Sequence, residues 1–156
     1  MHTHPQPTCT LRPARKSDFR AIRLLIHQVR INPAGLDWRR FIVSIDSSDR
    51  LIGCGQLKPH SDGSWELASI AVHPAWRKRG VATSLIRALI NSHPRPLYLT
   101  SRSELEPFYA KFGFRCLEFQ EMNPYFRRLY RLARIVFCFS RKPGKILVMY
   151  RDSSPS

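Results

Sequence analysis

The chain has 156 residues, which is enough for one domain with its own core and too few for two typical domains. Its 26 lysines and arginines against 11 acidic residues give a formal net charge of +15, which attracts polyanions such as nucleic acid, anionic lipid surfaces or phosphorylated ligands. No apolar run approaches the roughly 18 residues that a membrane-spanning helix needs, and no secretory signal is visible, so we expect a soluble, cytoplasmic protein.

The predicted elements begin after residues 1–8, a polar tail that we expect to be disordered. "TLRPA" predicts a short strand, and residues 16–30 predict a helix with Ser17 or Asp18 near its N-cap. "INPAGLDW" ends that helix, and the β-rich runs "RFIVSID" and "LIGCGQLKP" follow, joined by the polar "SSDR" as in a hairpin. A third β-run, "SWELASIAVHP", follows the turn "HSDG".

From Gly80 the apolar spacing becomes that of a helix, which ends before "SHPRP". The strand "PLYLTS" follows, and then a helix over 103–114, in which Ser103 and Glu106 have the spacing of a capping box and Gly113 is the stop. "FRCLEF" and "KILVMYR" predict two last strands, on either side of a basic helical insert at about 123–142. This order predicts a single mixed α/β, or α+β, domain over residues 9–152.

Cysteines and histidines give no sign of a metal or redox motif. The four cysteines lie far apart without a C-x-x-C pair, which fits a reducing compartment. The six histidines do not cluster outside the N-terminal tail, and we interpret His73 as structural. We therefore expect no metal cofactor. The cysteines are Cys9, Cys54, Cys116 and Cys138.

The stretch "VHPAWRKRGVATSLI" places three basic residues directly before a helix. Helix N-termini usually favour acids, because the first-turn N–H groups carry partial positive charge. Adding basic residues there indicates a site for an anion, most simply a phosphate, and Gly80 and Ala82 would let the backbone approach it. Taken alone, the pattern R-x-x-G-x-A is equally consistent with a basic helix start. Neither G-x-x-x-x-G-K-[ST] nor a G-x-G-x-x-G after a strand is present.

The segment "LASIAVHPAWRKRGVATSLI" resembles motif A of the GCN5-related N-acetyltransferase (GNAT) family, whose signature is [QR]-x-x-G-x-[GA]. The signature falls on Arg77, Gly80 and Ala82, between an apolar strand and a helix. Downstream, "LEPFYAKFGF" is similar to the family's motif B, and the order of elements over residues 9–151 is similar to the family's fold. The resemblance implies a mixed, mostly antiparallel sheet of about six to seven strands with helices on both faces.

The resemblance implies acetyl-CoA as co-substrate. Its pyrophosphate would lie on N–H groups of the basic turn, and its pantetheine amides would pair with the strand before that turn, as an added strand would. Many members carry an asparagine early in motif B, where this chain reads "SRSELEP", so Ser103 is the expected substitute. The implied coenzyme-binding residues are Ile70, Ala71, Val72, Arg77, Lys78, Arg79, Gly80, Val81, Ala82, Thr83 and Ser103.

Acetyl transfer to an amine needs a base for the amine's proton and an acid for the leaving thiolate. By the resemblance, Glu66 is the base and Tyr109, in Phe-Tyr-x-x-x-Gly-Phe, is the acid. Each has a simpler interpretation. Glu66 could be a solvent-facing edge-strand glutamate, and Tyr109 could belong to a core face with Phe108 and Phe112.

The basic insert contains the pattern of an amphipathic helix. Its expected apolar stripe is Phe126, Leu129, Tyr130, Ala133, Val136 and Phe137. Its expected opposite face is Arg127, Arg128, Arg131 and Arg134. The arginine face could be merely solvated, or it could recruit an acidic or phosphate-bearing partner near the thioester.

We therefore expect an acetyl-CoA-dependent N-acetyltransferase in which a primary amine attacks directly in a ternary complex. The acceptor could be a small molecule, a protein lysine or a protein N-terminus, and the charge argues against a polycationic acceptor such as spermine. Two alternatives use the same fold: a basic nucleic-acid- or ribosome-binding module, and a coenzyme A sensor without turnover. A homodimer is compatible with each of these readings.

Overall fold

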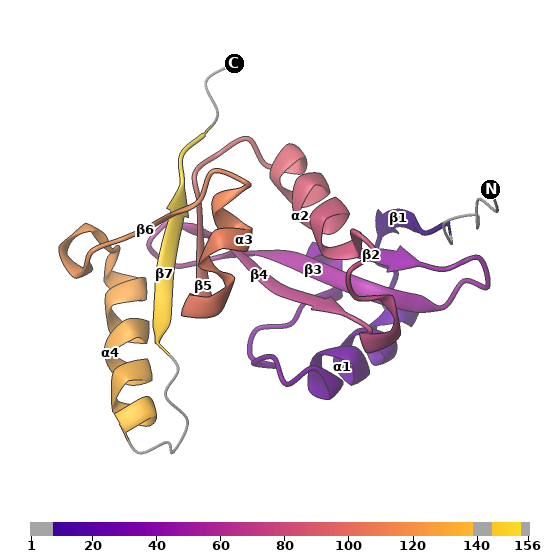
Figure 1. Ribbon diagram of the computed structural model, residues 1–156, viewed down its shortest axis with the longest axis horizontal. Coiled ribbons are helices and arrows are strands. Elements are labelled where there is room, and N and C mark those ends of the chain that lie inside the picture. The colour runs from indigo at the N-terminus through magenta and orange to yellow at the C-terminus, as the bar shows by residue number, and fades with distance from the viewer. Residues whose placement is uncertain (1–7, 139–144, 154–156) are drawn as a thin grey trace. The chain divides into compact units, whose positions relative to one another are not determined.

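A computed structural model of the chain describes residues 8–138 and 145–153 (Figure 1). The described residues form one seven-stranded sheet in the order β1-β2-β3-β4-β5-β7-β6. The strands are β1 (Thr10–Pro13), β2 (Phe41–Ile45), β3 (Leu51–Pro59), β4 (Trp65–Val72), β5 (Leu97–Arg102), β6 (Arg115–Cys116) and β7 (Ile146–Arg151). The α-helices are α1 (Phe19–Gln28), α2 (Val81–Ser92), α3 (Glu106–Ala110) and α4 (Pro124–Cys138). Apart from Thr8, the tail predicted to be disordered lies outside the described residues.

Strand pairing confirms a mixed, mostly antiparallel sheet. β2 pairs antiparallel with β1 and β3, and β7 pairs antiparallel with β5 and β6. β4 and β5 are parallel, with Glu66 opposite Tyr98. The hairpin predicted from "SSDR" is present, because Asp46 accepts the N–H groups of Ser48 and Arg50 at 2.8 and 3.0 Å and closes the turn.

The chain divides into two compact units. The first contains the residues up to Lys58 together with Leu67–His93, and therefore holds α1, α2 and most of β1 to β4. The second contains Pro59–Glu66 together with the residues from Pro94 onward, and holds β5 to β7, α3 and α4.

In the first unit, α1 and α2 cover opposite faces of the sheet (Figure 1). The apolar side of α1 packs in a cluster with Val43, Cys54 and Ala71. The neighbouring Gly53 faces α2, because successive strand residues point to opposite faces. A Cβ at Gly53 would lie 2.8 Å from Cγ1 of Val81, so the glycine allows α2 to approach the sheet. The helical spacing predicted from Gly80 is confirmed, since the buried residues of α2 are Val81, Leu85, Ile86, Leu89 and Ile90.

In the second unit, α4 packs against β7 (Figure 1). Phe126 of α4 is fully buried in a cluster with Met122 and Val148. Tyr98 of β5 stacks on Phe126 with ring centroids 4.7 Å apart, and its hydroxyl donates to the side chain of Asn123 at 2.7 Å. These contacts place the first turn of α4 over the start of β5.

Two predictions for this unit are wrong in detail. Ser103 does not cap a helix over 103–114, because a 3₁₀ turn over Ser103–Leu105 precedes the short α3. Glu106 accepts from the Cys116 thiol at 3.1 Å and so does not complete a capping box. The strand predicted over 114–119 is shortened to β6, because the chain then turns into a second 3₁₀ turn, Phe119–Glu121.

Asp18 ties β1 to the start of α1. Its carboxylate accepts two hydrogen bonds from the Arg12 guanidinium, at 2.7 and 3.1 Å, and one from the Arg15 N–H at 2.6 Å. The side-chain bond from Arg12, helped by the Arg15 N–H, holds the pKa of Asp18 below its ordinary value.

We expect Asp18→Asn to lower the free energy of unfolding by about 1 kcal/mol at neutral pH. A lowered pKa stabilises the folded state only while the carboxylate is ionised. The difference from wild type should therefore be complete above about pH 4 and vanish as the pH falls through the lowered pKa of folded Asp18. Urea unfolding of both proteins across this range measures it, and a difference that stays constant down to about pH 2 would contradict the assignment.

Candidate active site

The turn before α2 has the backbone shape of an anion site. Lys78 and Gly80 both have positive φ, at 59° and 78°, and Gly80 is the N-cap of α2. Turns containing such left-handed residues make adjacent N–H groups converge on one point. No atom lies within 4 Å of the position that a Cβ on Gly80 would occupy, so the space above the turn is open.

The N–H groups of this turn are available to a ligand. The first hydrogen bond of α2 runs from the Ser84 N–H to the Gly80 carbonyl at 3.0 Å. The preceding N–H groups, those of Val81, Ala82 and Thr83, consequently have no helical acceptor. A helix of twelve residues that begins with free N–H groups attracts an anion at this end.

Three basic residues precede these N–H groups in the chain. Arg77, Lys78 and Arg79 are exposed, and within the described ranges none of them forms an ion pair. The Arg79 guanidinium lies 5.3 Å from the Trp76 ring centroid, which holds it beside the turn. His73 accepts the Ala75 N–H at 3.2 Å and so caps the turn Pro74–Trp76, which agrees with its structural interpretation.

The strand leading into this turn carries the other expected coenzyme residues of the first unit. Within that unit β4 is the outermost strand, and Ile70, Ala71 and Val72 are its last residues. Just before them, Ser69 has φ 57°, which interrupts the regular strand, and its hydroxyl accepts from Nε2 of the buried Gln56 at 2.9 Å. The side chain of Ile70 lies over Gly55, where a Cβ would come within 2.5 Å of it.

Glu66 is not the solvent-facing glutamate of the simpler interpretation. Its side chain is 8% exposed, and one carboxylate oxygen, Oε2, lies 2.8 Å from Nε2 of His60. The other oxygen, Oε1, has a long contact of 3.5 Å with the Thr100 hydroxyl. Glu66 is therefore a buried carboxylate with one oxygen engaged and one largely uncommitted.

His60 was missed by sequence reasoning. The turn "HSDG" folds back so that the His60 N–H donates to the Ser64 carbonyl at 2.9 Å, which brings His60 close to Glu66 on the following strand. A tight turn flanked by a histidine and a glutamate was the available signal, but the turn geometry that pairs them is not visible in the sequence.

The two remaining predicted site residues, Tyr109 and Ser103, lie in the second unit, as Glu66 and His60 do. Burial raises the pKa of Tyr109 to about 12, and no hydrogen bond of its hydroxyl is found within the described residues. Its ring contacts the rings of Phe108 and Phe114 edge to face, so it also belongs to an aromatic cluster. Ser103 begins a 3₁₀ turn, and its N–H donates to the Lys145 carbonyl at 2.9 Å.

The arginines of α4 do not form one uniform face. Arg127 donates to the Gln120 carbonyl at 2.7 Å and stacks over Phe119, and Arg131 also stacks over Phe119. The expected apolar stripe is present at Phe126 but fails at Val136, which is 63% exposed. Phe119 lies in the 3₁₀ turn before α4, and its ring contacts Arg127 and Arg131. A helical projection could not show these contacts, because Phe119 is outside the helix. The acidic partner remains a prediction.

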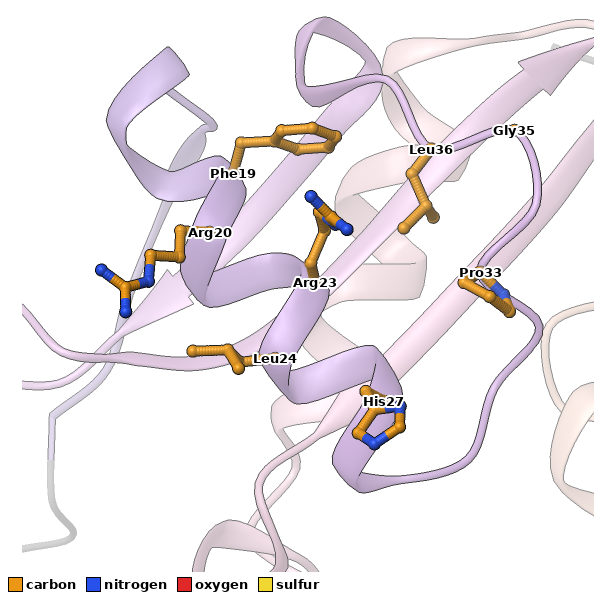
Figure 2. Close-up of a pocket in the computed structure, with 8 residues that line it drawn as sticks. All are labelled: Phe19, Arg20, Arg23, Leu24, His27, Pro33, Gly35 and Leu36. Atoms are coloured by element: carbon orange, nitrogen blue, oxygen red, sulfur yellow. The ribbon is translucent and has the colours of Figure 1, made fainter.

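A cavity of about 730 Å³ lies in the first unit between α1 and the loop that follows it (Figure 2). Its lining residues are Phe19, Arg20, Arg23, Leu24, His27, Pro33, Gly35 and Leu36. The Arg23 side chain lies between the Phe19 ring and the loop (Figure 2), with its guanidinium 5.9 Å from the ring centroid. Sequence reasoning singled out none of these residues, because the cavity depends on how the loop folds back.

The described ranges contain neither a group of metal-ligating side chains nor a membrane-spanning helix. No group of three or more histidine, cysteine, aspartate or glutamate side chains gathers there as metal ligands would. No helix in the same ranges has the length and hydropathy to cross a membrane.

Comparison with known structures finds the same fold in several acetyltransferases. N-acetylglutamate synthase from Neisseria gonorrhoeae, complexed with coenzyme A and N-acetyl-glutamate, matches with a TM-score of 0.73 and 18% identity over 95% of this chain and 36% of its own. This chain thus spans about a third of that synthase. The ribosomal-protein-S18-alanine N-acetyltransferase from Escherichia coli matches with a TM-score of 0.66 and 14% identity over 96% of each chain.

Rv2747 from Mycobacterium tuberculosis, in complex with CoA, matches with a TM-score of 0.71 and 19% identity over 92% of this chain and 98% of its own. A comparison with curated protein sequences returns no significant match. A family model described as an acetyltransferase (GNAT) domain matches residues 37–116, which is more than half of the 156 residues and includes the whole basic turn. The chain therefore belongs to the GNAT family of acetyltransferases.

Proposed function

We propose that the protein is an acetyl-CoA-dependent N-acetyltransferase that acetylates a primary amine by direct attack in a ternary complex. The observation that carries the proposal is the open turn at Gly80, where free N–H groups begin a helix directly after three exposed basic residues in a chain of this family. This combination suits the pyrophosphate of coenzyme A.

The residues of the first unit would hold the coenzyme. The N–H groups of Val81, Ala82 and Thr83 bind the pyrophosphate, while the guanidinium of Arg79 adds a charge-assisted contact. The Arg77 N–H donates instead to the Pro74 carbonyl at 3.4 Å. The outer backbone of Ile70, Ala71 and Val72 pairs with the pantetheine amides. Ser103, which replaces the usual asparagine of motif B, would offer a hydroxyl to the same arm.

In the reaction, the acceptor nitrogen attacks the thioester carbonyl carbon, the C–S bond breaks, and coenzyme A leaves as a thiolate. Glu66 takes the proton of the attacking amine at Oε1, directly or through a water. Tyr109 hydrogen-bonds the leaving sulfur. A hydroxyl with a pKa of about 12 remains protonated, but it is a weaker acid than an ordinary thiol, so we assign it stabilisation of the thiolate rather than full proton transfer.

Tyr109→Phe should therefore lower kcat by about tenfold, the loss of one hydrogen bond to a developing charge, and leave the KM for acetyl-CoA nearly unchanged. Its melting temperature should stay close to that of wild type, because the ring that packs against Phe108 and Phe114 is retained. Steady-state kinetics and thermal unfolding measure both quantities. A loss of stability with no loss of kcat would assign Tyr109 to the core alone.

The acceptor class is an amine on a small molecule or on a protein. Relatives of both kinds occur among the similar structures, one named for N-acetylglutamate and one for an alanine of ribosomal protein S18. The net charge of +15 favours an acidic or polyanion-associated acceptor over a polycation.

Two measurements separate the proposal from its alternatives. Thermal stabilisation by coenzyme A distinguishes a coenzyme-binding protein from a nucleic-acid-binding module that merely keeps the fold. Release of free thiol from acetyl-CoA, with a panel containing glutamate, a lysine peptide, a peptide with N-terminal alanine and spermine, distinguishes an enzyme from a sensor. We expect stabilisation by coenzyme A and thiol release that depends on at least one amine other than spermine.

A further inference from the structure

We propose that His60 is a positioning residue of this reaction: its imidazole holds the Glu66 carboxylate by one oxygen, so that the other oxygen can act as the base. The inference rests on the proposed role of Glu66 in taking the acceptor's proton. Family membership does not supply it, because His60 lies outside both motifs that indicate the family.

The geometry joins the two groups closely. Nε2 of His60 lies 2.8 Å from Oε2 of Glu66, and each side chain is only 8% exposed. A buried carboxylate is costly unless a donor satisfies it, and His60 is that donor. The bond uses one oxygen and leaves Oε1, with its long contact to Thr100, to face the acceptor.

The imidazole ring is itself held in place by α4. Tyr125 stacks on it with ring centroids 3.7 Å apart and planes 21° apart, and Phe126 meets its edge at 5.6 Å. The turn before Glu66 lies near the same helix, because the Tyr125 backbone contributes to the lowered pKa of Asp62. The first turn of α4 therefore fixes the orientation of the donor, and through it the orientation of the base.

A donor that fixes the carboxylate acts on the chemical step, because the base must be held in reach of the amine proton while the bond to the carbonyl carbon forms. Loss of the donor should therefore lower kcat and leave the KM for acetyl-CoA unchanged.

His60→Gln keeps a donor, because the glutamine amide nitrogen has a similar reach to Nε2 of histidine. We measure kcat for thiol release at about pH 8 with the fastest amine of the panel. The variant should retain the wild-type kcat within about threefold.

His60→Ala removes the donor, so its kcat should fall by about tenfold at the same pH, with acetyl-CoA KM unchanged. His27→Asn, at an exposed histidine of α1, is the matched control and should keep the wild-type kcat. A wild-type kcat for His60→Ala, or an equal loss of kcat in His60→Gln and His60→Ala, would overturn the proposal. If His60→Ala does not fold, His60→Leu is measured in its place, and loss of folding in both would assign His60 a structural role and also overturn it.

Glu66→Gln tests the proposed function separately from the role of His60. If Glu66→Gln retained the wild-type rate, the role of Glu66 as the base would be lost, and the inference about His60 with it. If Glu66→Gln is inactive while His60→Ala keeps the wild-type kcat, acetyl transfer through Glu66 stands and only the role of His60 is overturned.

Discussion

Gly80→Trp should weaken coenzyme A binding by more than about 100-fold while the protein remains folded, because at least two charge-assisted hydrogen bonds to the pyrophosphate would be lost. The indole would occupy the open space above the turn, where no atom now lies within 4 Å of the added Cβ. It would hold a phosphate away from the N–H groups of Val81 and Ala82. Calorimetric titration with coenzyme A measures the dissociation constant directly.

Gly63→Trp is the matched control for this experiment. Gly63 also has positive φ, 82°, and also has no atom within 4 Å of an added Cβ, so the backbone strain of the substitution is alike at both sites. Gly63 lies in the turn before β4, and that turn itself carries no expected coenzyme residue. If both variants bound coenzyme A equally well, the basic turn would not be the pyrophosphate site.

Glu66→Gln should lower kcat by about 10²–10⁴-fold, the usual effect of losing a general base, while coenzyme A binds as in wild type. The amide has the size of the carboxylate and can still accept the hydrogen bond from His60, so folding should be retained. An uncharged amide, however, cannot take the proton of the attacking amine. Single-turnover formation of the N-acetyl product, with enzyme in excess over acetyl-CoA, measures the chemical step.

Glu104→Gln is the control for loss of a carboxylate. Its side chain is 57% exposed and pairs with Arg102 at 3.4 Å, so its removal should change kcat by less than about twofold. If Glu66→Gln turned over as fast as Glu104→Gln at neutral pH, the base would lie elsewhere or the acceptor would arrive already deprotonated.

The basic turn could be predicted because its chemistry is local. An apolar strand, basic residues before a helix and a glycine that lets the backbone approach an anion are all readable from twenty consecutive letters, "LASIAVHPAWRKRGVATSLI". The burial of Val81 and Leu85 followed from helical spacing in the same way. Coenzyme-binding roles for Arg77 and Gly80 stay predictions until binding is measured.

The surroundings of Glu66 could not be predicted, because they depend on contacts between distant segments. His60 reaches Glu66 through a tight turn, and its ring is then covered by Tyr125, which is far along the chain. The interpretation of Glu66 as an exposed glutamate used the sequence of its own strand, which does not indicate what covers that strand.

The basic helix shows the same limit. A helical projection places residues by angle alone, so it predicted that Arg127 lies on the solvent side and Val136 on the buried side. Phe119 and the Gln120 carbonyl, both outside α4, contact Arg127 and leave it half-buried, while Val136 is 63% exposed. The capping box at Ser103 failed for a related reason, because a 3₁₀ turn displaced the start of α3 by three residues.

The proposed activity of this chain is the transfer of acetyl groups from acetyl-CoA to an amine. The most direct test is to incubate the purified protein with acetyl-CoA carrying a ¹³C-labelled acetyl group and the amine panel, and to measure labelled N-acetyl product by mass spectrometry alongside free coenzyme A thiol. We expect one labelled amide for each thiol released, in an amount that greatly exceeds the enzyme. Tight binding of coenzyme A with no labelled amide from any amine would contradict the claim and leave a coenzyme sensor.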